Sequence, residues 1–263
     1  MNQRVIRTLA IVTSFAVMAA ANNATAAEDG VWEGSLSASL AAQTGSNDTL
    51  NGSIDAEANR DTQEDEVGLR FNATYGQTRG TKDEEKDTIT QNSQALFGDW
   101  KRIVHEGLFW DTRSEVSRDT IQNREVRAAV STGPGYRVWN GDDAGKQHFD
   151  LSAGIGYRFE LIETPSTGDG DNYDPDHFSD IVAAFEYKNL LFDGRVDYTH
   201  TGSIKVPANS PSAWVARSEV IGSVPLSDAW SLRVSVLAEY QNTVPDDTNE
   251  LLTRTNLGLT YSF

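Results

Sequence analysis

Hydrophobic and polar residues alternate one by one along most of the chain. The segment HFDLSAGIGYRFEL, residues 148–161, has an apolar side chain at every second position from Phe149 to Leu161. The segments EVGLRFNATYGQ (66–77) and AWSLRVSVLAEYQN (229–242) repeat the pattern. A period of two is that of a β-strand, whose successive side chains point to opposite faces, whereas a helix has a period of 3.6 residues. The pattern therefore predicts an all-β protein.

Twelve segments carry this alternation, and from the third one onwards the connections between them alternate in length. Short connections include NLLF and PLSD, whereas long ones include GQTRGTKDEEKD and NTVPDDTNELL. If the first segment runs outward, the long connections all fall on one side, and the even number of segments places both chain ends on the other. The predicted strands cover residues 31–43, 49–60, 66–76, 88–98, 105–116, 124–139, 147–161, 179–188, 192–203, 213–224, 229–241 and 253–263.

Three features predict that the apolar face of these strands points outward. Charged residues occupy the middle of the polar face, aromatic residues gather near strand ends, and the long loops share one side. This combination is typical of outer-membrane barrels, which have a polar lumen and two aromatic girdles. A bilayer core offers no hydrogen-bond partners, so every strand must be paired and the sheet must close. We predict a closed, antiparallel, up-and-down transmembrane β-barrel of about 12 strands, within a range of roughly 10 to 14.

The first 27 residues have the layout of a secretory signal peptide. Arg4 and Arg7 precede an apolar run from Leu9 to about Ala21, and small residues follow it at 24–27. The apolar run is too short for a membrane-spanning helix, which needs about 20 residues. The expected organisation is a signal peptide at 1–27 and a barrel at 28–263, exported through the periplasm to the bacterial outer membrane.

The amino-acid composition bears on which partners the protein can bind and on how its fold is stabilised. The chain has 39 acidic and 22 basic residues and a net charge of −17, so nucleic acid is not an expected partner. It has no cysteine, so its fold must be stabilised without disulfides in spite of the expected export.

Four short stretches carry a family resemblance. The segments VWEGSLSASLAAQTGSN, GPGYRVW, LFDGRVDYTH and LGLTYSF resemble the bacterial outer-membrane family described as salt-induced outer-membrane proteins, a domain of unknown function. In that family Trp-x-Gly opens the first strand, as Trp32-Glu33-Gly34 does here. The first loop of the family usually carries Gly-Asn, and Gly45-Ser46-Asn47 departs from this pattern.

The resemblance implies an outer-membrane β-barrel of a Gram-negative bacterium, with no established activity, no cofactor and no catalytic residues. The end of the chain, Tyr261 and Phe263, resembles the C-terminal aromatic signal that the barrel-assembly machinery recognises. Assembly by that machinery and contact with outer-membrane lipids and lipopolysaccharide are therefore expected, and the protein is expected to be a monomer.

Charged residues on the polar face are the main candidates for function. Opposite charges on neighbouring strands can form lateral pairs, which either fill the lumen or line a narrow aqueous path. Twelve strands lie between filled eight-stranded barrels and wide sixteen-stranded porins, so the strand number leaves both alternatives open. The candidate lumen residues are Arg70, Asp111, Arg113, Arg158, Glu186, Arg195, Asp197, Arg217 and Arg233.

An acidic segment, GDGDNYDPDHFSD, invites comparison with calcium loops. Asp169, Asp171 and Asp180 occupy positions 1, 3 and 12 of such a loop, but Asp174 stands where an EF-hand needs glycine. The EF-hand interpretation therefore fails. A looser hypothesis is that carboxylates of an outer loop bind Ca²⁺ or Mg²⁺ weakly, and its candidates are Asp169, Asp171, Asp174 and Asp176.

The four histidines do not form a recognisable catalytic motif. His200 is expected near the outer end of a strand on the lipid side, and His177 in a solvated loop. A catalytic triad at His200 would need partners from neighbouring strands. We therefore expect a non-enzymatic envelope barrel of the salt- or stress-response type, with a narrow pore for small solutes as one form of that function. The alternatives are a membrane-embedded hydrolase of lipid or peptide and a non-conducting surface protein whose acidic loops bind divalent cations.

Overall fold

The structure is a computed structural model that describes residues 30–43, 48–79, 88–141, 147–164, 172–243 and 250–263. The expected signal peptide lies outside these residues. Twelve strands and two short 3₁₀ helices make up the described chain: β1 (Trp32–Gln43), β2 (Asp48–Asp61), β3 (Asp65–Arg79), β4 (Thr88–His105), β5 (Leu108–Asp119), η1 (Thr120–Gln122), β6 (Arg124–Asn140), β7 (His148–Thr164), β8 (Asn172–Leu191), β9 (Val196–Pro207), η2 (Pro211–Ala213), β10 (Val215–Pro225), β11 (Trp230–Gln241) and β12 (Leu251–Ser262).

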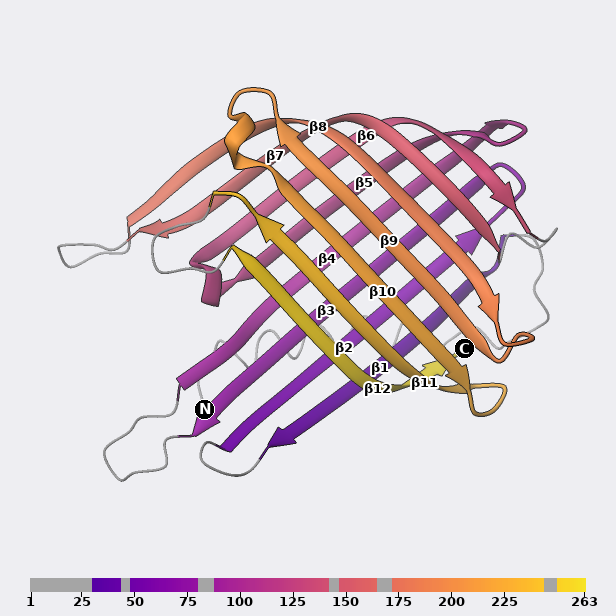
Figure 1. Cartoon of the computed structure of the whole chain (residues 1–263), viewed down its shortest axis with the longest axis horizontal. Helices are drawn as coiled ribbons and strands as arrows, with labels where there is room; N and C mark the ends of the chain where they lie inside the picture. The colour runs from indigo at the N-terminus through magenta and orange to yellow at the C-terminus, as the bar shows by residue number, and fades with distance from the viewer. Residues whose placement is uncertain (1–29, 44–47, 80–87, 142–146, 165–171, 244–249) are drawn as a thin grey trace.

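The strands form a closed antiparallel barrel in which each strand pairs with its neighbours in the sequence. β1 pairs with β12 and so closes the sheet, as the alternation predicts. The front strands cross the back ones in Figure 1, as tilted strands around a barrel do. No helix among the described residues is long and apolar enough to cross a membrane.

The two ends of the barrel differ in the connections that join consecutive strands. The short-turn end carries the tight turns at 62–64, 106–107, 192–195 and 226–229, and Phe263 lies there. The long-loop end carries η1 and η2, which connect β5 to β6 and β9 to β10. The connection at 208–214 has seven residues, as the predicted asymmetry requires, whereas that at 120–123 has four, as many as the turns at 192–195 and 226–229.

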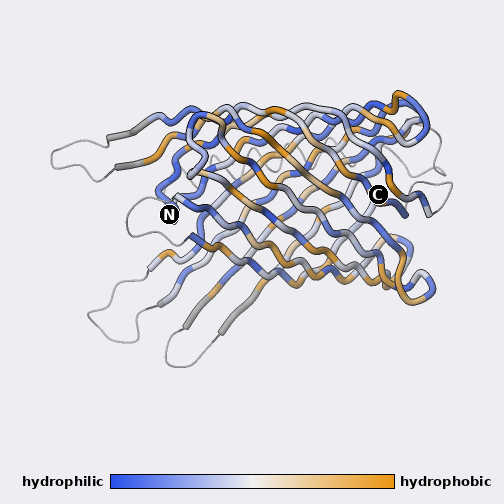
Figure 2. The backbone as a smooth tube through the Cα atoms, turned by 45° about the horizontal axis from the view of Figure 1, so that its top comes forward, coloured by the Kyte–Doolittle hydropathy of each residue, from blue (hydrophilic) through white to orange (hydrophobic). Residues whose placement is uncertain are grey.

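The barrel is apolar outside and polar inside. In the described chain, four hydrophobic residues and Pro207 are buried, against seventeen polar or charged residues. Ile155 and Ile181 are 71% and 62% exposed, and along the strands hydrophobic and hydrophilic positions alternate in Figure 2. A soluble barrel would bury these side chains, whereas a barrel in lipid presents them to the acyl chains. The outward orientation of the apolar face is therefore confirmed.

Aromatic side chains surround the outside of the short-turn end. Five tryptophans there are about half exposed, and neighbouring rings contact each other: the centroids of Trp230 and Tyr261 are 5.2 Å apart, and those of Tyr261 and Phe263 6.0 Å. At the long-loop end Trp214 packs against Tyr240, with centroids 4.9 Å apart. Indole and phenol groups favour the boundary between lipid and water. The five tryptophans are Trp32, Trp100, Trp110, Trp139 and Trp230.

The bounds of three strands differ by four residues or more from those predicted. β4 continues to His105, β9 is displaced to Val196–Pro207, and β8 begins at Asn172, inside a segment that the sequence presents as a loop. β7 supplies partners for this whole extension, from Thr164 opposite Asn172 onwards. β9 pairs with β8 only from Asp180, so Pro175 lies on a local edge where its missing N–H costs little.

Candidate functional site

The lumen is the candidate site, because charged side chains from all around the barrel meet there. Many of these ion pairs join strands that are not neighbours in the sheet and therefore cross the lumen. Arg70 on β3 reaches Glu219 on β10, for example, with β2, β1, β12 and β11 between them on the shorter way round. Three groups of contacts follow one another along the barrel axis.

The short-turn cluster is centred on Asp150, which is 2% exposed. Lys101 Nζ lies 2.6 Å from Asp150 Oδ2, and Arg137 Nε donates to Asp150 Oδ1 at 2.8 Å. Both cations also contact Glu66, each at 3.0 Å. Strands β3, β4, β6 and β7 each contribute one of these four side chains, so the cluster joins one side of the barrel to another.

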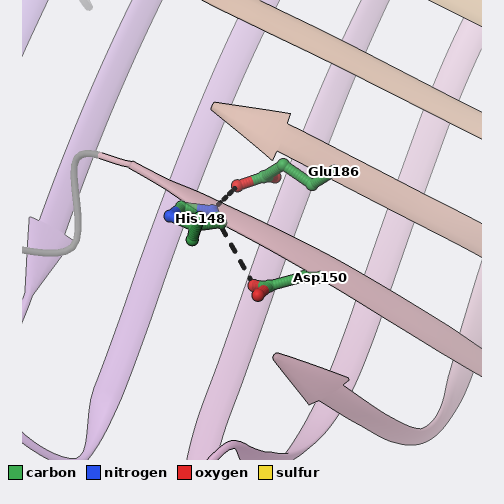
Figure 3. A group of neighbouring side chains, drawn as sticks. All are labelled: His148, Asp150 and Glu186. Atoms are coloured by element: carbon green, nitrogen blue, oxygen red, sulfur yellow. Dashed lines mark hydrogen bonds and ion pairs between the residues drawn. The ribbon is translucent and has the colours of Figure 1, made fainter. Parts of the chain in front are cut away.

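Three potential metal ligands lie in the same cluster. The ligand atoms of His148, Asp150 and Glu186 lie within 4.8 Å of one another (Figure 3). His148 Nε2 is 2.8 Å from Glu186 Oε1 and 3.8 Å from Asp150 Oδ2. Imidazole and carboxylate groups suit zinc, but the two carboxylates already contact Lys101 at 2.6 Å and Lys188 at 3.0 Å. The arrangement is that of an ion-pair network, since a metal would have to displace these ammonium groups.

The central partition consists of Arg70, Phe97, Glu115, Arg217 and Glu219. Phe97 stands on β4, and its ring receives two guanidinium groups, Arg70 at 4.8 Å and Arg217 at 4.9 Å from the centroid. Glu219 Oε2 lies 3.1 Å from Arg70 Nη1 and 3.3 Å from Arg217 Nη2. β4 and β10 lie on opposite sides of the closed sheet, so these contacts span its width.

Two cavities lie on either side of this partition. The larger, about 680 Å³, lies towards the short-turn end and the smaller, about 60 Å³, towards the long-loop end. Arg70, Phe97, Glu115 and Arg217 line both of them. The partition therefore narrows the lumen between two polar spaces.

The long-loop cluster holds the opposite end of the lumen. Arg127 Nε donates to Glu160 Oε1 at 2.6 Å, and its Nη1 donates across the barrel to Glu239 Oε1 at 3.1 Å. Arg158 joins Glu160 to Asp180, with contacts of 2.8 and 3.1 Å. All five side chains are buried, and their charges are matched by near partners, as buried ions require.

Two further pairs support the same end. Asp119 Oδ1 accepts hydrogen bonds from the backbone N–H groups of Ile121 and Gln122 and so caps η1. Its other oxygen lies 2.6 Å from Arg254 Nη2 on β12, across the lumen. Gln241 Nε2 donates to Gln122 Oε1 at 3.2 Å, which ties η1 to β11.

Most of the predicted lumen residues do point inward and are paired. Asp111 accepts a hydrogen bond from Ser152 and contacts Arg113 at 2.7 Å, and Arg233 contacts Glu57 at 2.8 Å. The charged candidates that the structure brings into the lumen network are Arg70, Asp111, Arg113, Arg158, Glu186, Arg217 and Arg233.

Arg195 and Asp197 lie apart from this network. Arg195 is exposed in the turn at 192–195, because β9 begins only at Val196 rather than at residue 192. Asp197 is exposed near the start of β9, opposite Ser223 of β10. Arg195 and Asp197, both expected in the lumen, therefore do not join Arg217 and Arg233 in the network of the described chain.

The acidic segment is largely strand. Asp169 and Asp171 lie outside the described residues, whereas Asp174 and Asp176 belong to β8, opposite Ile162 and Glu160 of β7. His177, expected in a solvated loop, lies in β8 with its Nδ1 2.6 Å from the Tyr157 hydroxyl. Two of the four carboxylates that were expected in one cation-binding loop therefore lie in a strand instead.

His200 lies on the outer face of β9, nearer the short-turn end than expected. Its Nε2 is 3.0 Å from Ser218 Oγ on β10, and the ring of Phe185 packs edge-on against it at 4.8 Å. The register partners of His200 are Tyr187 and Val220, so no carboxylate stands beside it in the neighbouring strands. A serine and a histidine therefore meet here without the third group of a triad.

Several central residues were missed at the level of sequence. Asp150 shares the parity of other polar-face residues, but nothing in the sequence shows that a lysine from a non-adjacent strand joins an arginine from the neighbouring strand at its carboxylate. Lys101 and His148 lie near strand ends, where the alternation fades. Phe97 is an apolar residue on the polar face. The one signal in the sequence that indicates this is its position two residues before Asp99, which places both side chains on the same face of the strand.

A family model described as "Protein of unknown function, DUF481" matches residues 36–263. The chain belongs to this family. The match confirms the expected domain of unknown function, and the salt-induced designation stays an expectation. Among curated proteins, none matches this DUF481 chain.

Solved structures share the barrel fold at very low sequence identity. The translocator domain of the autotransporter NalP from Neisseria meningitidis is similar with a TM-score of 0.50 and 8% identity, over 99% of this chain and 96% of that one. The NanC porin has a TM-score of 0.44 and 8% identity over 87% and 98% of the two chains. The KdgM porin has a TM-score of 0.41 and 9% identity over 89% and 99%. At these identities the likeness to NalP establishes the fold alone.

Proposed function

We propose that this DUF481 barrel is a non-enzymatic outer-membrane protein that passes small ions and solutes along its charged lumen. The observation that carries the proposal is the central partition, where Arg70, Arg217 and Phe97 narrow the space between two polar cavities. Charged side chains that line a constriction select and limit what crosses a pore. The apolar, aromatic-flanked outer face supports a position in a membrane.

Planar-bilayer recordings of the refolded protein test this proposal. We expect small, discrete conductance steps from the unchanged protein, because the partition leaves little free width. Phe97→Ala removes the ring on which both guanidinium groups lie, and it should raise the unitary conductance severalfold. Leu96→Ala is the matched control, since Leu96 is the adjacent residue on the outer face and is 49% exposed.

The outcome separates a pore from a filled barrel. An increase with Phe97→Ala and none with Leu96→Ala supports conduction through the partition. Silence of all three proteins, at a load where a porin conducts, contradicts the proposed pore and favours the non-conducting alternative.

The location and partners belong to the same proposal. Outer-membrane lipids, lipopolysaccharide and the barrel-assembly machinery of a Gram-negative bacterium are the expected partners, and the protein is expected to act as a monomer. Heat-modifiable migration on detergent gels and recovery in the outer-membrane fraction would support this. Equal migration of boiled and unboiled samples, with the protein in the periplasmic fraction, would contradict it. The salt-response role predicts that its amount rises at high salt, which immunoblotting measures.

A hydrolase is the second candidate, because His200 and Ser218 lie within hydrogen-bond distance on the outer face. A histidine that takes the serine proton could activate it towards an ester. We place it second because the neighbouring strands offer no carboxylate to orient the imidazole. Turnover of phospholipid that His200→Ala abolishes would favour this candidate, and absence of turnover would remove it.

A further inference from the structure

Arg124 is a buried guanidinium group without a hydrogen bond in the described chain. It stands at the start of β6, directly after η1, and is 7% exposed. The carboxylate oxygen nearest to it is Glu239 Oε1, 4.0 Å from its Nη1, which is too far for a hydrogen bond. A buried charged donor without an acceptor is costly, so the site calls for an acceptor that is not part of the chain.

The guanidinium lines the smaller cavity, whose volume is about 60 Å³. One water needs roughly 10–15 Å³ on this measure, so the space holds about four to six waters. A tetrahedral oxyanion has five heavy atoms and matches this size. The central partition narrows the passage towards the larger cavity, so we expect a ligand to enter from the long-loop end.

The lining arginines of the cavity include donors without a partner, whereas each lining carboxylate already has at least one polar partner. Arg254 also lines it, and the buried Nε of Arg254 has no partner among the described residues. The five lining carboxylates, in contrast, all have polar partners already: Asp55 with Asn72, Glu115 with Lys205, Asp119 with Arg254, Glu219 with Arg70, and Glu239 with Arg127. A ligand that only accepts hydrogen bonds therefore fits better than a cation or a donor-rich sugar.

We propose that this cavity binds a free tetrahedral oxyanion of the phosphate or sulfate class, held mainly by Arg124. A planar guanidinium can donate two parallel N–H bonds to such an anion. The Nε of Arg254 supplies a further donor after a small adjustment of its side chain. The site lies inside the barrel wall, which excludes lipid headgroups as the source of the phosphate. It is independent of the proposed pore, because binding requires no conduction.

Calorimetric titration of the refolded full chain in detergent tests the site. Inorganic phosphate, sulfate and chloride are titrated separately at constant ionic strength. Saturable heat is expected with phosphate or sulfate and not with chloride, which has no pair of oxygens spaced to match the two parallel N–H bonds of the fork and no further oxygens for a second donor. Arg124→Gln should weaken binding by about tenfold or more, the loss expected for charge-assisted hydrogen bonds.

Arg113→Gln is the matched control, since Arg113 is a lumen arginine that lines the larger cavity and not the smaller one that holds Arg124. It should leave the affinity within about twofold of the unchanged value. Arg124→Lys keeps the charge without the fork and should give an intermediate loss; if Arg124→Gln does not fold, this variant carries the test. No heat with either oxyanion, equal binding of chloride, or an unchanged affinity after substitution of Arg124 each overturns the proposal.

Discussion

Asp150 shows how a single lumen residue can depend on both a neighbouring and a more distant strand. Its carboxylate is shared by Lys101 from β4 and Arg137 from β6, both of which are largely buried. Asp150→Asn should therefore lower the free energy of unfolding by about 3–5 kcal/mol, because two buried cations lose one partner. The measurement is urea unfolding of the refolded barrel in detergent, followed by tryptophan fluorescence.

Glu64→Gln is the control for that substitution. Glu64 also pairs with an arginine, Arg102 at 2.7 Å, but its side chain is 69% exposed. Exposed pairs contribute at most about 1 kcal/mol, so the midpoint should hardly move. Equal decreases in the free energy of unfolding for Asp150→Asn and Glu64→Gln would contradict the view that the lumen pairs stabilise the fold because they are buried.

Gly34 is required by the ring of Phe263. A Cβ at position 34 would lie 2.6 Å from Cε2 of that ring, while the backbone groups of the two residues hydrogen-bond each other at 2.9 and 3.0 Å. Gly34→Ala should displace the ring from the joint between β1 and β12 and cost about 1–3 kcal/mol. Gly222→Ala is the control, since a Cβ at Gly222 meets no atom within 4 Å. The same unfolding assay compares the two, and equal stability would contradict the proposed contact.

Sequence predicts the direction of a lumen side chain better than its partner. Parity places Arg70, Arg217 and Arg233 inside the barrel, and the structure agrees. The partner of Arg70 is Glu219, 149 residues away, and nothing local links the two. Their contact depends on barrel closure and on strand tilt, which alternation does not encode.

Among the strand pairs, the one that closes the barrel is the shortest. β1 and β12 are in register from Ser35 to Ser39, opposite Gly258 to Ser262, with one further backbone pair between Gly34 and Phe263, whereas β7 and β8 pair from His148 to Thr164. Fewer ladder hydrogen bonds mean a lower cost of local opening. Hydrogen–deuterium exchange should therefore be faster in peptides from β1 and β12 than in those from β7 and β8. Equal protection of both pairs would contradict a weak joint.

A disulfide can lock this joint in a chain that has no cysteine of its own. Ser37 and Thr260 are register partners whose hydroxyl oxygens are 2.6 Å apart. Ser37→Cys with Thr260→Cys should slow exchange in β12 on oxidation and stabilise the barrel by about 2–4 kcal/mol. The reduced form of the same variant is the control, and an unchanged exchange rate after oxidation would place the weak point elsewhere.

The number and order of strands could be predicted at the scale of elements, but some bounds could not. Alternation identifies all twelve strands because lipid and lumen impose opposite chemistry on successive residues. The start of β8 was missed because Pro175 and its acidic neighbours resemble a turn, although β7 provides the partners that make this segment a strand. Whether a polar segment pairs is decided by its neighbour, which its own sequence does not show.

At the scale of the whole molecule, an inverted distribution of polarity is the central feature. The lumen is rich in matched charges, and the outer face is apolar with a belt of aromatic rings at the short-turn end. In a membrane, the acyl chains would cover the apolar face while ion pairs brace the interior, which would stabilise a fold that has no cysteine. This distribution is tested by measuring whether two adjacent residues of one strand face lipid and lumen, respectively.

Ser203 and Ile204 offer the most direct measurement. Ile204 is 41% exposed on the outer face, whereas Ser203 lines the larger cavity, and the two lie at the same depth because they are adjacent on β9. Ser203→Cys and Ile204→Cys are labelled with a fluorophore and refolded into vesicles of brominated-chain lipids. The account predicts strong quenching at position 204 and little at 203. Equal quenching, or stronger quenching at 203, would contradict a barrel whose apolar face meets the membrane.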